Sequence, residues 1–449
     1  MKIRSRLSPP FCLYNSAPRA VLCLTVLLYV VFPLRAQTLD RIERGRAQDM
    51  LAAIKGDLKK NYYDANFHGV DIDGRFKAAD EKLKQAASLG QAFGIIAQAL
   101  LDLNDSHTFF LPPPRPERIE YGWRMQMIGE KCYVSAVKPG SDAAAKGLKE
   151  GDAITSLGGF SPTRRDFWKM QYYYNALSPR PGMKVVAQSP DGQQHQLEIK
   201  ADVKQGKRVI NLADSIDLNE LIRGIESDER ANRHRYIENL NGVFVWKMPA
   251  FDLTEESVDG IMEKVKGRKA LILDLRGNGG GAEVTLLHLL GYFFDKNLKV
   301  ADINSRKESK PLIAKTRGNG HTFSGALVVL VDSDSASSSE LFARVIQLEK
   351  RGTVIGDHTA GAVMRARHYR HDAGVNTIVP YGVSITDADA IMSDGKSLER
   401  SGVTPDEIVL PTSADMLARR DPVMARAAAL AGAQLTADKA GALFPIEWR

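Results

Sequence analysis

Residues 335–340 read Ser-Ala-Ser-Ser-Ser-Glu and follow the apolar run ALVVLVD of residues 326–332. Upstream, residues 274–281 read Asp-Leu-Arg-Gly-Asn-Gly-Gly-Gly and end a second apolar run, ALILDL, of residues 270–275. Short continuous apolar runs are typical of strands in a sheet that is covered on both faces. Each run is followed by small residues and then by a helical pattern. These two strand-turn-helix units predict an α/β sheet in which the serines and the glycine amides lie at the same edge.

A serine hydroxyl beside bare backbone amides is the outline of an acyl-transfer site. Other interpretations exist for each motif alone. Ser337 and Glu340 also have the spacing of a capping box at a helix start, and a glycine-rich turn after a strand often serves close packing. The coincidence of both motifs, with four serines where one cap would suffice, favours Ser337 as a nucleophile.

The first 36 residues have the pattern of an export signal. Four basic residues precede the apolar run Ala20–Leu34, and Ala36 offers a small residue for cleavage before Gln37. This segment holds five basic and no acidic residues, so the formal charge of +7 falls to about +2 once it is removed. We therefore expect an exported protein, periplasmic or extracellular, without stable membrane insertion after signal removal. The small remaining charge gives no argument for nucleic acid as a partner.

Cysteine usage and motif spacing indicate neither a disulfide nor a cofactor. Cys12 and Cys23 belong to the signal segment, which leaves Cys132 alone in the mature chain. The histidines and carboxylates lack the H-E-x-x-H spacing of a zinc site, and the glycine run lacks the G-K-[ST] ending of a phosphate loop. We expect no metal and no cofactor.

The remaining chain divides into four predicted parts. Residues 37–115 have helical spacing and end at a proline-rich linker, and residues 116–205 read as short strands and turns. Strand and helix patterns alternate over residues 206–412. Residues 413–449 form a helical tail, in which Asp421-Pro422 predicts a fresh helix start.

Residues 134–154 contain V-x-x-V-x-P-G-S-x-A and then G-L-x-x-G-D-x-I, which closely resembles a PDZ domain. PDZ domains bind an extended peptide as an added strand, often at a free C-terminus. The resemblance places the carboxylate-binding loop at Tyr121-Gly122-Trp123-Arg124, which departs from the usual Gly-Leu-Gly-Phe. A PDZ domain that acts only as a rigid lid or spacer remains an alternative.

The PDZ pattern, D-L-R-x-N-x-G-G, S-A-S-x-S-E and Gly-Val-Thr-Pro-Asp at residues 402–406 together resemble the C-terminal processing serine peptidases and the related tricorn core. The resemblance covers nearly the whole mature chain. It implies a multidomain α/β protein with a crotonase-like (ClpP/crotonase) catalytic domain, a helical N-terminal segment and an inserted β-barrel-like PDZ domain. It also implies that Ser337 is the nucleophile and that the amides of Ser338 and of Gly279 or Gly280 bind the oxyanion.

One departure from this family concerns the general base. The processing peptidases place a lysine after T-x-G, where this chain has Ala362, and no lysine lies between Lys350 and Lys396. Arg365 stays protonated and is no base. A Ser-Lys dyad at this position is therefore excluded.

The tricorn-like branch uses a histidine that directly follows a serine, together with a distant glutamate. Residues 105–108, Asp-Ser-His-Thr, resemble its signature and imply His107 as the base, Ser106 as its polar partner and Glu399 as the glutamate. An imidazole with an ordinary pKa near 6.5 is suited to accept the serine proton at neutral pH. His358 remains an alternative base.

These observations predict an exported serine endopeptidase that hydrolyses unfolded or C-terminally recognised polypeptides. Two alternatives remain. The chain is a catalytically inactive peptide-binding protein that works through its PDZ domain, or it hydrolyses a non-peptide acyl substrate. The sequence does not indicate an oligomeric state.

Overall fold

The computed structural model describes residues 39–115, 117–205, 234–318, 320–374, 378–446 and 448. The predicted signal segment, residues 1–36, lies outside the described residues. From Thr38 onward the chain forms one compact unit. Within the described ranges, no helix combines the length and apolar character needed to cross a membrane.

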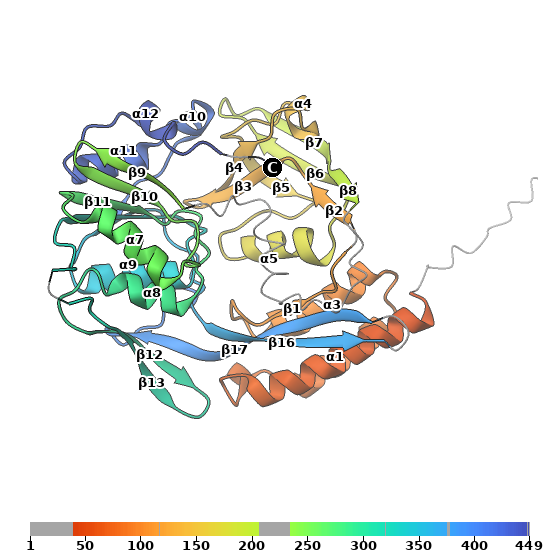
Figure 1. The fold of residues 1–449 in the computed structure, drawn as a ribbon. Helices are drawn as coiled ribbons and strands as arrows, with labels where there is room; N and C mark the ends of the chain where they lie inside the picture. Colours follow the sequence, from red (N-terminus) through yellow and green to blue (C-terminus); the bar gives the residue numbers. More distant parts are fainter. Residues whose placement is uncertain are drawn as a thin grey trace, which may run out of the picture. The chain divides into compact units, whose positions relative to one another are not determined.

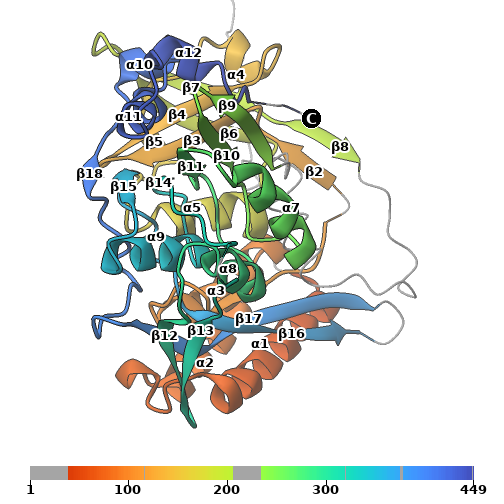
Figure 2. The same ribbon diagram turned by 60° about the vertical axis from the view of Figure 1, so that its left-hand side comes forward.

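A six-stranded sheet carries the two motifs (Figures 1 and 2). In spatial order its strands are β18 (Glu407–Ile408), β15 (Thr353–Gly356), β14 (Ala326–Val331), β11 (Ala270–Asp274), β10 (Val243–Lys247) and β9 (Arg235–Leu240). All neighbours are parallel except β9 and β10. β11 and β14 lie side by side, with Ala270 opposite Ala326 and Asp274 opposite Leu330. The prediction that both turns lie at one sheet edge is confirmed.

Helices cover both faces of this sheet. On one face, α7 (Glu255–Val265), α8 (Glu283–Leu290) and α9 (Ser338–Leu348) share an apolar core with it. On the other face lie α11 (Pro422–Leu430) and α12 (Ala437–Gly441), preceded in sequence by α10 (Ser413–Leu417). Because both faces are covered, every residue of β11 is buried. Asp421 caps α11 and Pro422 occupies its first turn, so the predicted helix start is confirmed.

A second, antiparallel sheet was not predicted from the sequence (Figure 2). Its strands are β1 (Phe109–Leu111), β17 (Val379–Met392), β12 (Leu298–Ser305), β13 (Ser309–Ala314) and β16 (Arg365–Ala373). Helices α1 (Arg41–Asn61), α2 (Ile72–Leu83) and α3 (Leu89–Leu101), with the short η1 (Phe67–Gly69), pack against β17 through one apolar core. The sheet therefore joins strands from opposite ends of the chain.

A third sheet is antiparallel and has five strands in the order β3-β4-β5-β6-β7. The strands are β3 (Trp123–Ile128), β4 (Lys131–Val137), β5 (Ala153–Leu157), β6 (Gly182–Gln188) and β7 (Gln194–Lys200). The helices α4 (Asp142–Ala145), α5 (Phe167–Tyr172) and η2 (Tyr173–Leu177) accompany it, and β2 (Glu117–Glu120) pairs separately with β8 (Asp202–Gln205). β3 lies at the edge of this sheet.

The edge strand β3 contacts the loop that leads to the serine turn. The Ser333 hydroxyl donates to the carbonyl of Met127 at 2.6 Å, and the Gln126 amide donates to Asp332 at 2.6 Å. Arg164 binds both the carbonyl of Gly129 and the carboxylate of Asp357. Polar contacts therefore hold the third sheet against the edge of the six-stranded sheet that carries Ser337.

A buried ion network anchors the glycine loop. Arg276 binds Asp274 through Nε and Nη2 at 2.9 and 2.8 Å, and it also binds Asp421 at the start of α11. Burial raises the pKa of the Asp274 carboxyl, but the charges of Arg276 and Lys247 outweigh burial and hold that pKa below its ordinary value. The Asp-Leu-Arg motif thus ties the end of β11 to the tail helix.

Replacing Arg276 with methionine should lower the free energy of unfolding by about 3 kcal/mol, because the completely buried Asp274 carboxylate loses its bidentate partner. Urea unfolding monitored by circular dichroism measures this change. Arg426→Met is the matched control: its ion pair with Glu407 is exposed to solvent, so its loss should change the free energy of unfolding far less. Equal losses in the two variants would contradict the structural role of Arg276.

Candidate active site

Ser337 has a backbone conformation that non-glycine residues rarely adopt, with φ +54° and ψ −118°. It lies directly before α9, and its amide donates to the Ala362 carbonyl at 2.7 Å and to Glu340 Oε2 at 3.0 Å. Of the capping box considered from the sequence, the Glu340 side chain accepts from the Ser337 amide, whereas the Ser337 hydroxyl accepts from no amide of the helix among the described residues. A strained serine between a strand and a helix is also the geometry of an exposed nucleophile. The cap and the nucleophile are therefore compatible.

Asn278 joins the glycine loop to the serine turn. Its backbone carbonyl accepts hydrogen bonds from the amide of Ala336 and the hydroxyl of Ser339, both at 2.9 Å. A Cβ added at Gly280 would lie 2.6 Å from the Ser337 Cβ and 3.2 Å from its Oγ. Only a residue without a side chain permits this approach, which explains the glycine at position 280.

The candidate oxyanion donors differ in whether their backbone amides already donate a hydrogen bond within the protein. The amide of Gly280 donates to Asn278 Oδ1 at 2.8 Å. Within the part of the chain that the structure describes, the amides of Gly279, Gly281 and Ser338 donate to no other protein group. Of the two glycines expected from the sequence, only Gly279 has an amide left for a ligand, and the amide of Gly281, which the sequence did not single out, is left as well.

Glu340 is completely buried and accepts four hydrogen bonds. The donors are the hydroxyl of Thr359 and the amides of Gly361, Ala362 and Ser337, at 2.6 to 3.0 Å. Burial raises the pKa of this carboxyl to about 7, although the four donors favour the ionised form. Glu340 thus connects the serine turn to residues 359–362.

Asp105 shapes the turn that carries His107. Its buried carboxylate accepts hydrogen bonds from the amides of His107 and Thr108, the hydroxyl of Thr386 and the phenol of Tyr62. The next strand, β1, then pairs with β17. The pairing of β1 with β17 therefore places the turn that carries His107 in the same cleft as Ser337. No role was assigned to Asp105 from the sequence. Its place in the Asp-Ser-His-Thr motif, two residues before His107, was the feature that could have indicated one.

Ser106, His107 and Glu399 form a hydrogen-bonded relay. The Ser106 hydroxyl donates to Glu399 Oε2 at 2.9 Å and lies 2.7 Å from His107 Nδ1. A hydroxyl has a single proton, so a Ser106 that donates to the carboxylate accepts from Nδ1–H. This tautomer leaves the lone pair of His107 on Nε2, as a general base requires.

Burial sets the protonation of this relay. It lowers the pKa of the His107 imidazole to about 4, so the ring is neutral at neutral pH. It also raises the pKa of Glu399, while the amides of Ser106 and Val363 and the Ser106 hydroxyl donate to the carboxylate and oppose that shift. These donors favour the ionised Glu399 carboxylate, which is the acceptor that the Ser106 hydroxyl needs.

One cleft of about 1800 Å³ is lined by Ser337, His107, Ser106, Gly279 and Gly280. No lysine lines it among the described residues. His358 also lines the cleft, and its Nδ1 lies 3.3 Å from the Thr404 hydroxyl rather than beside a carboxylate. The structure thus brings the candidate nucleophile and both candidate bases to one cleft.

The candidate peptide-binding loop lines a second cavity, of about 790 Å³, between β3 and α5. Tyr121, Trp123 and Arg124 line this cavity, and Gly122 adopts φ +72° against Ser141. Ser106 lines both cavities, together with Phe109, Met127, Trp168 and Asp334. The two cavities are therefore neighbours along a shared wall.

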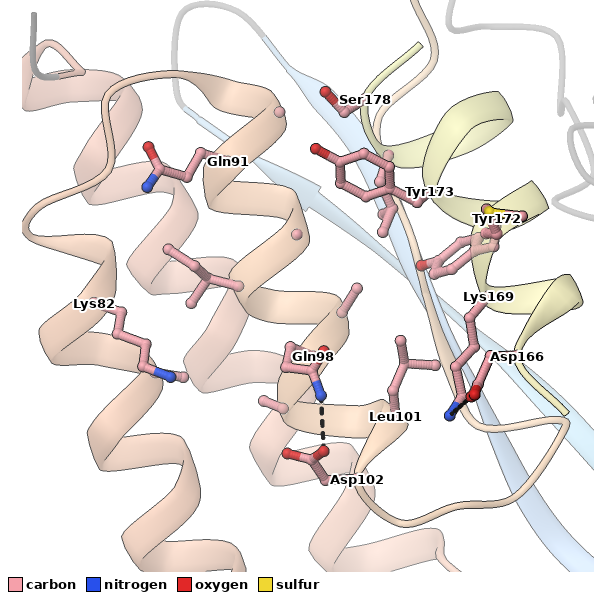
Figure 3. A pocket seen from close by; sticks show the side chains of 18 of the residues that line it. Lys82, Gln91, Gln98, Leu101, Asp102, Asp166, Lys169, Tyr172, Tyr173 and Ser178 are labelled. Atoms are coloured by element: carbon pink, nitrogen blue, oxygen red, sulfur yellow. Dashed lines mark hydrogen bonds and ion pairs between the residues drawn. The ribbon is translucent and has the colours of Figure 1, made fainter. Parts of the chain in front are cut away.

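A third cavity, of about 1530 Å³, lies between α2 and α3 on one side and α5 and η2 on the other (Figure 3). Tyr172 and Tyr173 lie across it from Gln98 and Leu101. None of the candidate catalytic residues lines this cavity, so its size alone does not mark it as the catalytic site.

The described residues contain no group of three histidine, cysteine or carboxylate side chains placed to hold a metal ion. Cys132 is buried, and burial raises the pKa of its thiol to about 12. The thiol is therefore protonated and a poor nucleophile at neutral pH.

Residues 243–409 match the model of peptidase family S41. The chain is 27% identical over 277 residues to the tail-specific protease of Haemophilus influenzae, an alignment that covers 57% of this chain and 36% of that protein. It is 23% identical to the chloroplastic C-terminal processing peptidase of Tetradesmus obliquus, with 81% of this chain and 78% of that protein covered.

The crystal structure of mature CPAF has a similar fold, with a TM-score of 0.62 at 15% identity over 84% of this chain and 94% of that one. The chain spans only about a third of the length of the Haemophilus relative. The strands β10, β11, β14 and β15, the glycine loop and the serine turn all lie within the matched range. Residues 243–409 therefore belong to peptidase family S41, a family of serine-type peptidases.

Proposed function

We propose that this protein is a serine endopeptidase in which Ser337 is the nucleophile and His107 the general base. The observation that carries the proposal is the relay from Glu399 through Ser106 to His107 Nδ1 in the structure. It leaves Nε2 unprotonated in the same cleft as the strained Ser337. A neutral imidazole with an oriented second nitrogen is the arrangement that activates a serine hydroxyl.

The proposed reaction has two halves. Ser337 Oγ bonds to the peptide carbonyl carbon while its proton passes to His107 Nε2. The carbonyl oxygen becomes an oxyanion, which the amides of Ser338 and of a neighbouring glycine, Gly279 or Gly281, stabilise. The carbon–nitrogen bond then breaks, and His107 returns the proton to the leaving amine. Water hydrolyses the acyl-enzyme by the same proton path.

The third sheet is proposed to be a PDZ domain, and the α/β region beside it a crotonase-like catalytic domain. An extended polypeptide would add to the outer edge of β3, because β3 pairs only with β4 in its sheet, and it would displace the Ser333 hydroxyl from the Met127 carbonyl. The shared wall of the two cavities would then lead the bound chain toward Ser337. The pattern of residues 1–36 supports action outside the cytoplasm.

Replacing Ser337 or His107 with alanine should lower kcat for an unstructured polypeptide by at least about 10³-fold without unfolding the protein. Fluorescein-labelled reduced casein reports hydrolysis, and circular dichroism reports folding. A fluorophosphonate should label Ser337 in the unmodified protein. His358→Ala is the matched control and should retain activity. Full activity of either main variant would refute the assignment, and a folded protein without labelling would favour the inactive peptide-binding alternative.

The relay predicts a second set of losses. Ser106→Ala and Glu399→Gln should each lower kcat by about 10²- to 10⁴-fold with little change in KM, because the imidazole loses the group that holds its reactive tautomer. Thr404→Ala, which removes the partner of the alternative base His358, should leave kcat unchanged. Steady-state kinetics on one peptide substrate measures all three. A larger loss in Thr404→Ala than in Ser106→Ala would assign the base to His358.

Activity should persist in mild acid. The base works in its neutral form, and burial lowers the pKa of His107 to about 4, so kcat/KM should hold between pH 7 and about 5 and fall as the pH passes through about 4. The profile is measured wherever circular dichroism shows a folded protein. Half-loss anywhere between pH 6 and 7 would contradict a base whose pKa is lowered to about 4.

A further inference from the structure

The segment that follows α12 crosses from the six-stranded sheet to the third sheet. Leu443 and Phe444 pack against the apolar core beneath α11. Arg235 donates to the carbonyl of Pro445 at 2.9 Å, and its guanidinium lies 5.3 Å from the centre of the Phe444 ring. One end of this segment is therefore anchored on the catalytic region.

The other end of the segment reaches the candidate peptide-binding loop. The Arg124 guanidinium lies 4.7 Å from the centre of the Trp448 ring, within the range of a cation–π contact. Arg124 is in the edge strand β3. Phe444 and Ile446 line the 790 Å³ cavity together with Tyr121 and Trp123. Side chains of the chain's own tail thus contribute to the wall of the groove that an added peptide strand would enter.

The chemistry of these contacts is that of a peptide ligand. Phe444, Ile446 and Trp448 are large apolar side chains, and two of them are aromatic. Ile446 lines the groove and is 49% exposed, so it is only partly buried there. The strand edge of β3 also has a backbone acceptor in use, because the carbonyl of Met127 binds the hydroxyl of Ser333. An incoming polypeptide strand must displace contacts at both places.

We propose that Phe444, Ile446 and Trp448 act as an internal ligand of the groove between β3 and α5, and that they compete with polypeptides for the groove. The effect on turnover rests on the proposed peptidase function, whereas the competition for binding does not. Ser106 lines both this groove and the catalytic cleft. A polypeptide that cannot enter the groove therefore cannot pass along this shared wall to the catalytic residues.

The cation–π contact between Arg124 and Trp448 is weak enough for a polypeptide substrate to displace it. A partly exposed cation–π pair changes an equilibrium by about 2- to 30-fold. Removing the Trp448 ring should therefore increase the affinity of the groove for an external peptide by a factor in this range. Trp448→Phe retains a ring over Arg124 and should give an intermediate affinity.

The test uses the full chain with Ser337→Ala, so that hydrolysis has no part in the result. The probe is a fluorescein-labelled peptide with the sequence of residues 443–449, and its binding is measured by fluorescence anisotropy. Trp448→Ala in this background should bind the probe about 3- to 10-fold more tightly than the parent. Arg124→Gln, added to Trp448→Ala, should reverse the gain because it removes the guanidinium that receives the ring.

Equal probe affinity in the parent and Trp448→Ala would overturn the proposal. If Trp448→Ala is destabilised in thermal unfolding, a chain that stops after Pro445 replaces it, since Phe444 and Pro445 then keep their contacts with Arg235. Unlabelled peptide of the same sequence should displace the probe from this shortened chain, and failure to do so would also overturn the proposal. Inactivity of the wild type with tighter probe binding to Trp448→Ala would refute the peptidase function alone.

Discussion

One buried and one partly buried carboxylate accept hydrogen bonds from the same short stretch of backbone, and the geometry of the cleft depends on this constraint. Glu340 accepts from the amides of Gly361 and Ala362, and Glu399 accepts from the amide of the next residue, Val363. Glu340 also holds Ser337, while Glu399 holds Ser106. Residues 361–363 therefore set the distance between the serine turn and the histidine relay. A buried carboxylate is costly without such donors, so each one requires this backbone arrangement.

The same stretch contains Ala362, at the position where the resemblance to the processing peptidases led us to expect a lysine. In this structure the backbone of Ala362 helps to position the serine turn: its carbonyl accepts from the Ser337 amide, and its amide donates to Glu340. The proposed base instead comes from a turn more than 200 residues upstream, which the buried carboxylate of Asp105 shapes and the pairing of β1 with β17 locates. A partly buried imidazole is neutral at neutral pH without a nearby cation, whereas a lysine would need strong desolvation.

Local patterns were informative where short-range physics decides the structure. Continuous apolar runs predicted the buried strands β11 and β14, and Asp421-Pro422 predicted the start of α11, because burial and capping are properties of a few consecutive residues. The second sheet escaped prediction. β16 is largely exposed, and β17 pairs with β1 and β12, which lie far from it in the sequence, so neither carries a complete signal in its own sequence. The engagement of the Gly280 amide by Asn278 likewise depends on a loop conformation that composition does not reveal.

The sequence by itself determined the α/β arrangement of the two motif-bearing units and their common edge, because parallel strands that are buried on both faces need long apolar runs and place their following turns together. It also determined the absence of a lysine at position 362. Only the tertiary structure decided which side chains meet there. The relay of Ser106, His107 and Glu399, and the contact of Arg124 with Trp448, each join residues that are nearly 300 or more positions apart. Such contacts arise from the packing of whole sheets, and no local pattern of residues encodes the register in which sheets pack.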